Sequence, residues 1–245
     1  MVEVTFIGCG DAFGSGGRFN TCFLVSGAHC RLLIDCGASS LVALKQRGID
    51  PNGIDGIVLS HLHGDHFGGL PFLLLDAHHL SRRERPLFLW GPAGTGTRLK
   101  EAQEALFPGS SETPLRFPFV CREIAAGECA AGEGFAVTPF PAAHSAGAPC
   151  FSLRLEIDGR IVAYSGDTAW TDALCAAGQG ADLFICECSS YARALSGHLA
   201  YAELAPRLEQ IGAKRVILTH MNPDMLAARD GIAHAAAEDG LAISL

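Results

Sequence analysis

The chain has 245 residues, 49% of them hydrophobic, which is enough to bury the core of one large domain or of two closely packed halves. We expect a single domain over residues 1–245. The formal net charge of −8 gives no general attraction to phosphate backbones, so large nucleic acids are not expected as partners.

The sequence also predicts no membrane-spanning segment and no secretion signal. No apolar stretch is long enough to cross a bilayer, so no membrane partner is expected, and residues 1–8 resemble a first strand, not a secretion signal. The ten cysteines include no CxxC pair, and reduced thiols are their simplest state. These features predict a cytoplasmic protein.

Short β-type runs alternate with helical patterns, with Gly, Asp or Pro between them. The first half predicts, in chain order, strands at 2–7, 21–26, 30–35, 56–60, 86–90 and 117–124, and helices at 38–47, 67–81 and 93–107. The second half predicts strands at 134–140, 149–157, 160–165, 181–187 and 214–219, and helices at 168–177, 199–211 and 224–238. The fold class is therefore α/β, with two similar halves whose sheets face each other and carry helices outside.

The most informative segment follows the strand predicted at 56–60. His61, His63, Asp65 and His66 place four potential metal ligands within six residues. On an extended segment His61 and His63 project to the same side, and Gly64 permits a turn that brings the other two toward a second metal. Imidazole with carboxylate suits zinc, iron or manganese.

Three later polar residues also follow apolar strands: His144, Asp167 and His220. Taken singly, each is ordinarily a cap or a turn residue. Together with the histidine cluster, they complete a set of ligands for two metals.

The chain resembles the metallo-β-lactamase superfamily over nearly its full length. The HxHxDH motif is His61 to His66, and His144, Asp167 and His220 follow in the order of the family. The resemblance implies a four-layer αββα sandwich. It also implies that His61, His63 and His144 hold one metal, that Asp65, His66 and His220 hold the other, and that Asp167 bridges them.

Within the superfamily the chain is most similar to the ribonuclease Z-like branch. The segments that carry this similarity are Phe6–Gly10, Arg18–Asn20, Leu33–Gly37, Gly68–Pro71 and Tyr164–Thr168. In that branch a glutamate orients a histidine close to the metals, and Glu187 and His198 occupy those places. Leu199-Ala200 replaces the Ser-Thr that usually follows the histidine, so His198 can instead be a structural residue at a helix N-terminus.

Ribonuclease Z carries a long basic arm that grips tRNA, inserted between the ligands that match His144 and Asp167. Here only 23 positions separate these two residues, enough for one hairpin. The missing arm and the acidic composition argue against tRNA processing.

Asp35 ends the strand predicted at 30–35 and has two interpretations. Metal-bound imidazoles usually donate their other N–H to a carboxylate, which is one possible role for Asp35. The other is a cap for the helix that begins near Ala38.

These residues predict a hydrolase with two divalent metals, most simply zinc, with manganese or iron as alternatives. A hydroxide bridging the metals would attack a small or cyclic phosphodiester, with Asp65, Glu187 and His198 as catalytic residues. The alternatives are hydrolysis of a lactone or thioester at the same site, ribonuclease Z-type RNA processing, and a non-enzymatic metal-binding protein. The resemblance also suggests a homodimer.

Overall fold

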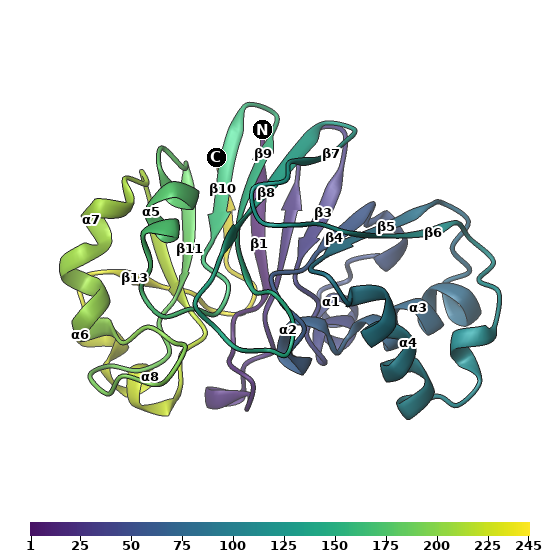
Figure 1. Ribbon diagram of the computed structural model, residues 1–245, viewed down its shortest axis with the longest axis horizontal. Helices are drawn as coiled ribbons and strands as arrows, with labels where there is room; N and C mark the ends of the chain where they lie inside the picture. Colours follow the sequence, from purple (N-terminus) through teal and green to yellow (C-terminus); the bar gives the residue numbers. More distant parts are fainter.

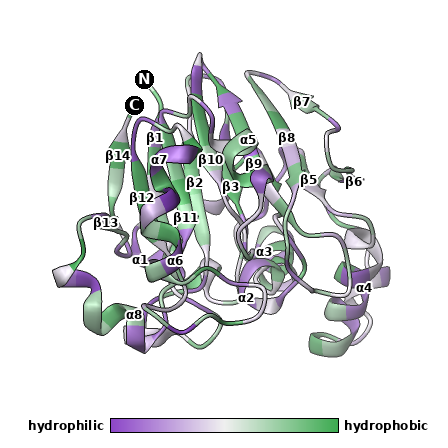
Figure 2. Cartoon of the chain, turned by 60° about the vertical axis from the view of Figure 1, so that its left-hand side comes forward, coloured by the Kyte–Doolittle hydropathy of each residue, from purple (hydrophilic) through white to green (hydrophobic).

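The computed structural model describes residues 1–245 and contains two seven-stranded sheets packed face to face, with helices on the outer sides (Figure 1). This arrangement confirms the predicted αββα sandwich. Hydrophobic residues are concentrated on the strands, as Figure 2 shows, because the central strands of each sheet bury their side chains against the other sheet or the helices. No helix is both long and apolar enough to span a membrane.

The first sheet has the order β14-β1-β2-β3-β4-β5-β6. Strands β3, β4, β5 and β6 run parallel, so the carboxyl ends of β3, β4 and β5 lie at one edge. The strands of this sheet are β1 (Glu3–Gly8), β2 (Cys22–Ser26), β3 (Arg31–Ile34), β4 (Gly56–Val58), β5 (Leu87–Gly91), β6 (Phe119–Glu123) and β14 (Ala242–Ser244). The helices that follow its strands are α1 (Ser40–Gln46), α2 (Gly64–Phe67), α3 (Leu70–Leu75), the π-helical turn η3 (Asp76–Leu80) and α4 (Thr95–Leu106).

The second sheet has the order β13-β12-β11-β10-β9-β8-β7 and contains a parallel segment from β10 to β13. Its strands are β7 (Ala130–Gly132), β8 (Phe135–Pro141), β9 (Phe151–Ile157), β10 (Arg160–Tyr164), β11 (Leu183–Glu187), β12 (Val216–Thr219) and β13 (Ala235–Ala236). The helices of this half are α5 (Asp172–Gly178), α6 (Tyr201–Leu204), α7 (Leu208–Ile211) and α8 (Pro223–Ala228).

All eleven predicted strands form, but three helical predictions differ from the structure. The helix predicted at 67–81 is divided between the end of α2, α3 and the π-helical turn η3. The helix predicted at 224–238 ends as α8 and a short 3-10 turn, and Ala235–Ala236 then pairs with β12 as β13. The helix predicted at 199–211 is divided into α6, a 3-10 turn containing Pro206, and α7. Proline removes a backbone donor from the helix interior, which explains this last break.

The last strand, β14, was not predicted and returns to the first sheet beside β1. The pairing joins the two ends of the chain, since Val4 lies opposite Ile243. Its three residues are too few to show a periodicity in the sequence. Their position in the sheet is determined by the edge of β1, which would otherwise be unpaired.

Tyr164 lies in the core between the two sheets and gives a test of its packing. Its side chain is fully buried against Phe23, with ring centroids 5.1 Å apart, and its hydroxyl has no hydrogen-bond partner. A buried hydroxyl without a partner costs about 1–3 kcal/mol. We therefore expect Tyr164→Phe to raise the free energy of unfolding by about 1 kcal/mol in urea titrations. A loss of stability would instead show that the hydroxyl has a partner, such as a trapped water.

Candidate metal centre

The expected ligands converge because each follows the end of a strand at the same edge of the sandwich. His61 and His66 come after β4, His144 after β8, Asp167 after β10 and His220 after β12. Carboxyl ends of parallel strands meet at one edge of a sheet, and the face-to-face packing brings the edges of both sheets together. All seven side chains predicted as ligands lie in this one cluster.

The first group in the cluster consists of three imidazoles. His61 Nε2 lies 3.2 Å from His63 Nδ1, which lies 3.1 Å from His144 Nε2. Donor atoms at about 2.1 Å from a tetrahedral zinc ion are about 3.4 Å apart. The three nitrogens therefore have the spacing of three corners of such a site, and they can hold a metal ion.

The second group is more buried and includes a carboxylate. Asp65 Oδ2 lies 3.1 Å from His66 Nε2 and 3.1 Å from His220 Nε2. All three side chains are buried, with at most 9% of the residue exposed. This group offers two nitrogens and one oxygen to a second ion.

Asp167 lies between the two groups. Its Oδ1 is 3.4 Å from His66 Nε2, and its Oδ2 is 3.8 Å from His61 Nε2 and 3.5 Å from His220 Nε2. The residue is only 2% exposed. A carboxylate placed in this way can bind an ion in each group at the same time.

Unsatisfied polar atoms support a metal site. His66 Nε2 and Asp167 Oδ1 are buried and have no hydrogen-bond partner, although they lie 3.4 Å apart. Buried polar atoms rarely remain unpaired in proteins. A cation between them would satisfy both, so the cluster of histidines and aspartates fits a metal site.

A surrounding set of hydrogen bonds holds the imidazoles in place. Asp35 Oδ2 lies 2.7 Å from His66 Nδ1 and accepts a 2.7 Å hydrogen bond from Ser60 Oγ. The other nitrogen of His144, Nδ1, lies 2.9 Å from the carbonyl oxygen of Gly197. Such contacts fix the ring orientation and leave the second nitrogen free for a metal.

These contacts decide between the two interpretations of Asp35. It contacts His66 and does not cap the following helix, which begins at Ser40 with Ser39 in the cap position. Sequence reasoning missed Ser60 and Gly197. Ser60 directly precedes His61, but no pattern in the sequence pairs Gly197 with His144, 53 residues earlier.

Glu187 and His198 meet as the resemblance implies. His198 Nδ1 lies 3.2 Å and 3.3 Å from the two carboxylate oxygens of Glu187, and 4.0 Å from Asp167 Oδ2. Glu187 is fully buried and also accepts a 2.6 Å hydrogen bond from the backbone N–H of Thr168. His198 is partly exposed, three residues before α6, at the edge of the cluster.

The strand ends at this site carry unusual backbone conformations. Asp35 and His220 have φ of 59°, in the left-handed region that non-glycine residues seldom occupy. Gly166, just before Asp167, has φ of 60°, and a Cβ there would lie 2.3 Å from the carbonyl oxygen of Phe151. Such conformations are costly and cluster at functional sites, where the surrounding structure maintains them.

The two groups of the cluster differ in their proton affinity. Burial and the neighbouring His66 lower the pKa of His61 well below its ordinary value, and burial also lowers the pKa of His144. Burial disfavours the charged form of His220 too, but Asp167 and Asp65 outweigh it and raise its pKa to about 9. Lowered pKa values favour the neutral forms of His61 and His144 before metal binding, and the raised value of His220 favours its protonated form at pH 7.

Comparison with known proteins agrees with this geometry. Residues 30–221 match the family model described as the beta-lactamase superfamily domain, so the chain belongs to this family of metal-dependent hydrolases. Ribonuclease Z of Methanothermobacter thermautotrophicus is 28% identical over 273 aligned positions, covering 91% of this chain and 87% of the relative. An uncharacterized protein of Mycobacterium tuberculosis is 32% identical over 243 positions, covering 97% and 86%.

Solved structures share the fold. The short form of human tRNase Z matches with a TM-score of 0.80 and 26% identity, covering 99% of this chain and 98% of that one. Zn²⁺-bound PqqB from Methylobacterium extorquens has a TM-score of 0.78 at 16% identity, covering 99% and 100%, which shows the fold alone.

We expect metal binding to release protons at pH 7, because His220 must lose its proton before its nitrogen can bind a metal. The raised pKa means that this proton competes with the metal below pH 9, so affinity should rise as the pH increases toward that value. The number of protons released can be measured by calorimetric titration of the metal-free protein with zinc in two buffers that differ in their heat of ionisation.

His220→Ala should reduce the number of protons released, and His79→Ala, at an exposed histidine outside the cluster, should not. Heats that do not depend on the buffer would contradict this assignment.

Proposed function

We propose that this protein is a dinuclear metal-dependent phosphodiesterase that acts on small phosphodiesters such as cyclic nucleotides or related cyclic phosphates. The observation that carries the proposal is the pair formed by buried Glu187 and His198, 4.0 Å from Asp167, beside a complete set of seven potential ligands. A structural or scaffold role gives no reason to keep a partly exposed histidine aimed at this cluster by a buried carboxylate.

In this proposal His61, His63 and His144 would hold one ion, Asp65, His66 and His220 would hold the second, and Asp167 would contact both. Two divalent ions so held supply an activated water and neutralise negative charge that develops on the phosphate. Imidazole and carboxylate donors with near-tetrahedral spacing favour zinc, and manganese or iron remain compatible with the same donors. Asp65 also has a positioning role, because its carboxylate contacts both His66 and His220 and fixes their positions relative to each other.

His198 is the residue proposed to protonate the leaving oxygen. Burial disfavours its charged form, but the hydrogen bond and the charge of Glu187 outweigh burial and raise the pKa of His198 above its ordinary value. The raised pKa favours the protonated form of His198, which can donate its proton. Because Glu187 holds Nδ1, the free Nε2 is the atom available to the leaving group.

The opening beside the cluster is small. A pocket of about 320 Å³ is lined by His144, Ser145, Ser196 and Gly197, together with Ala143. Binding sites for small molecules start at about this volume. A small phosphodiester therefore fits the opening better than a folded RNA does.

The chain also lacks the space for an RNA-binding arm. The connection from His144 to Asp167 contains a short loop, β9, a two-residue turn and β10, and nothing more. The alignment to the ribonuclease of Methanothermobacter has 273 positions but includes only 91% of this chain, so about 50 of its positions have no counterpart here. The mycobacterial relative aligns over 243 positions with 97% of the chain, almost without such gaps. The size of the chain therefore supports a small substrate.

A substrate screen with the zinc- or manganese-loaded protein tests the proposal. We expect hydrolysis of bis(p-nitrophenyl) phosphate and of cyclic nucleotides, and loss of both activities in Asp167→Ala. Lactones, thioesters and a precursor tRNA belong in the same screen. Activity confined to lactones or thioesters, or processing of the tRNA alone, would contradict the small-phosphodiester assignment.

The leaving group distinguishes a catalytic His198 from a structural one. Nitrophenolate leaves without a proton, whereas the alkoxide of a cyclic nucleotide needs one. We expect His198→Ala to lower kcat on cyclic nucleotides by ~10²–10⁴-fold and to have a much smaller effect on bis(p-nitrophenyl) phosphate.

The matched control is His79→Ala, which should leave both rates unchanged. Equal losses on the two substrates would mean that His198 only supports the fold of the site.

A further inference from the structure

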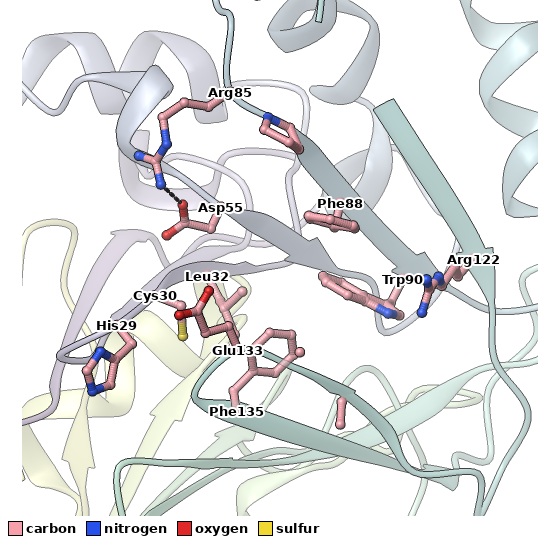
Figure 3. Close-up of a pocket in the computed structure, with 13 residues that line it drawn as sticks. His29, Cys30, Leu32, Asp55, Arg85, Phe88, Trp90, Arg122, Glu133 and Phe135 are labelled. Atoms are coloured by element: carbon pink, nitrogen blue, oxygen red, sulfur yellow. Dashed lines mark hydrogen bonds and ion pairs between the residues drawn. The ribbon is translucent and has the colours of Figure 1, made fainter. Parts of the chain in front are cut away.

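A second cavity lies between the two sheets, beside β5 and the edge strands β6 and β7 (Figure 3). It has a volume of about 450 Å³. His29, Asp55 and Pro86, which line it, come just before β3, β4 and β5, whereas the expected metal ligands follow the strand ends. The metal centre therefore accounts for none of its residues.

The walls of this cavity are aromatic rings in fixed positions. Phe88 and Trp90 lie two residues apart on β5, so they share one face; their rings stack at 5.6 Å and 20°. Phe135 of β8 meets the Trp90 ring edge-on at 5.2 Å. The cavity lies at the edge of the sandwich, where β6 ends one sheet and the three-residue strand β7 ends the other.

Two glycines give the rings their space. A Cβ at Gly56 would lie 2.5 Å from the ring of Trp90, and a Cβ at Gly132 would lie 2.4 Å from the ring of Phe135. The rings therefore pack directly on backbone and have little freedom to move. A rigid slot with aromatic walls suits a planar ring.

One end of the cavity carries two hydrogen-bond donors and no acceptor. Trp90 is 3% exposed, and its indole Nε1 has no partner. Arg122 lies opposite Trp90 in the register of β5 and β6, and its guanidinium forms no ion pair or hydrogen bond. Figure 3 shows the indole nitrogen on the side of the ring that faces Arg122. Since Arg122 is exposed, its side chain can rotate to admit an acceptor between the two donors.

The other end of the cavity carries an unpaired carboxylate. Arg85 is already paired with Asp55, but Glu133 has no ion pair or hydrogen bond to its side chain. In Figure 3 Glu133 lies beside Leu32, away from Arg122. The cavity is therefore positively charged at one end and negatively charged at the other.

We propose that this cavity binds a planar aromatic carboxylate that carries a hydrogen-bond donor at the far side of its ring. The carboxylate accepts hydrogen bonds from Trp90 Nε1 and from the guanidinium of Arg122, the ring packs against the aromatic walls, and the donor faces Glu133. Charge-assisted hydrogen bonds to a carboxylate are about twice as strong as neutral ones, which is why an anion is preferred over a neutral carbonyl compound.

The two tryptophans of the chain, Trp90 and Trp170, allow a direct test by NMR. In ¹⁵N-labelled, zinc-loaded protein each gives one indole N–H signal, and Trp170, which packs under Arg207, serves as the reference. The probe is 4-aminobenzoate, which has the required carboxylate, ring and amino group. We expect it to shift the Trp90 signal downfield in a saturable way and to leave the Trp170 signal in place. Trp170→Phe assigns the signals without altering the cavity.

Neutral 4-aminobenzamide, which has the same shape, should bind at least about tenfold more weakly. Arg122→Gln should weaken 4-aminobenzoate binding by a similar factor, and Arg160→Gln, at an arginine outside the cavity that pairs with Asp182, should leave it within about twofold. Both arginines are exposed, so neither change should affect folding.

A Trp90 signal that does not move up to the solubility limit of the probe would overturn the proposal. Equal affinity for the amide, or an unchanged affinity in Arg122→Gln, would overturn it as well. Because the experiment measures an indole signal and not a reaction rate, its result does not depend on the phosphodiesterase proposal.

Discussion

The burial of the Asp167 carboxylate among histidine side chains is the constraint on which the site depends. Burial by itself would raise the pKa of this group, but His220 and His66 lower it well below the usual range, so it stays ionised inside the protein. A buried charge is tolerable only where opposite charge surrounds it. Protons on His66 and His220 provide that charge in the metal-free protein, and metal ions would provide it in their place. The same electrostatic balance thus holds the site together with or without metals.

The fold makes this balance possible because the polar side chains of the site lie after the ends of strands. The last three residues of β4, β10 and β12 are buried and most of them are apolar, which stabilises the sheets. The first potential metal ligand follows each of these strands by one to three residues, where the backbone turns away and the side chains from both sheets face one another. These abrupt turns place Asp35 and His220 in left-handed backbone conformations, which cost free energy. Hydrogen bonds such as that from the His220 N–H to the carbonyl oxygen of Cys9 help to offset this cost.

The metal cluster and the aromatic cavity differ in their electrostatics. At the carboxyl ends of the strands, five histidines and two aspartates converge on sites for cations. At the edge formed by β6 and β7, the aromatic cavity presents an indole N–H without a hydrogen-bond partner and an arginine without an ion pair. Both features come from the same physical situation, in which buried polar atoms lack partners within the protein. The partner that would satisfy them is a cation in the metal cluster and an anion in the aromatic cavity.

The sequence by itself determined which residues form the strands and which polar residues follow them. Alternating or continuous apolar runs are local patterns, so all eleven strands and the seven clustered side chains could be predicted, and the family order of His144, Asp167 and His220 could be matched to the HxHxDH segment. Tertiary structure decided the rest. The return of β14 to β1, the pairing of Ala235–Ala236 with β12, the contact between the Gly197 carbonyl and His144, and the cavity beside Trp90 all depend on residues far apart in the chain. Such contacts leave no periodic signal, because their free energy comes from surfaces that exist only after the two sheets have packed.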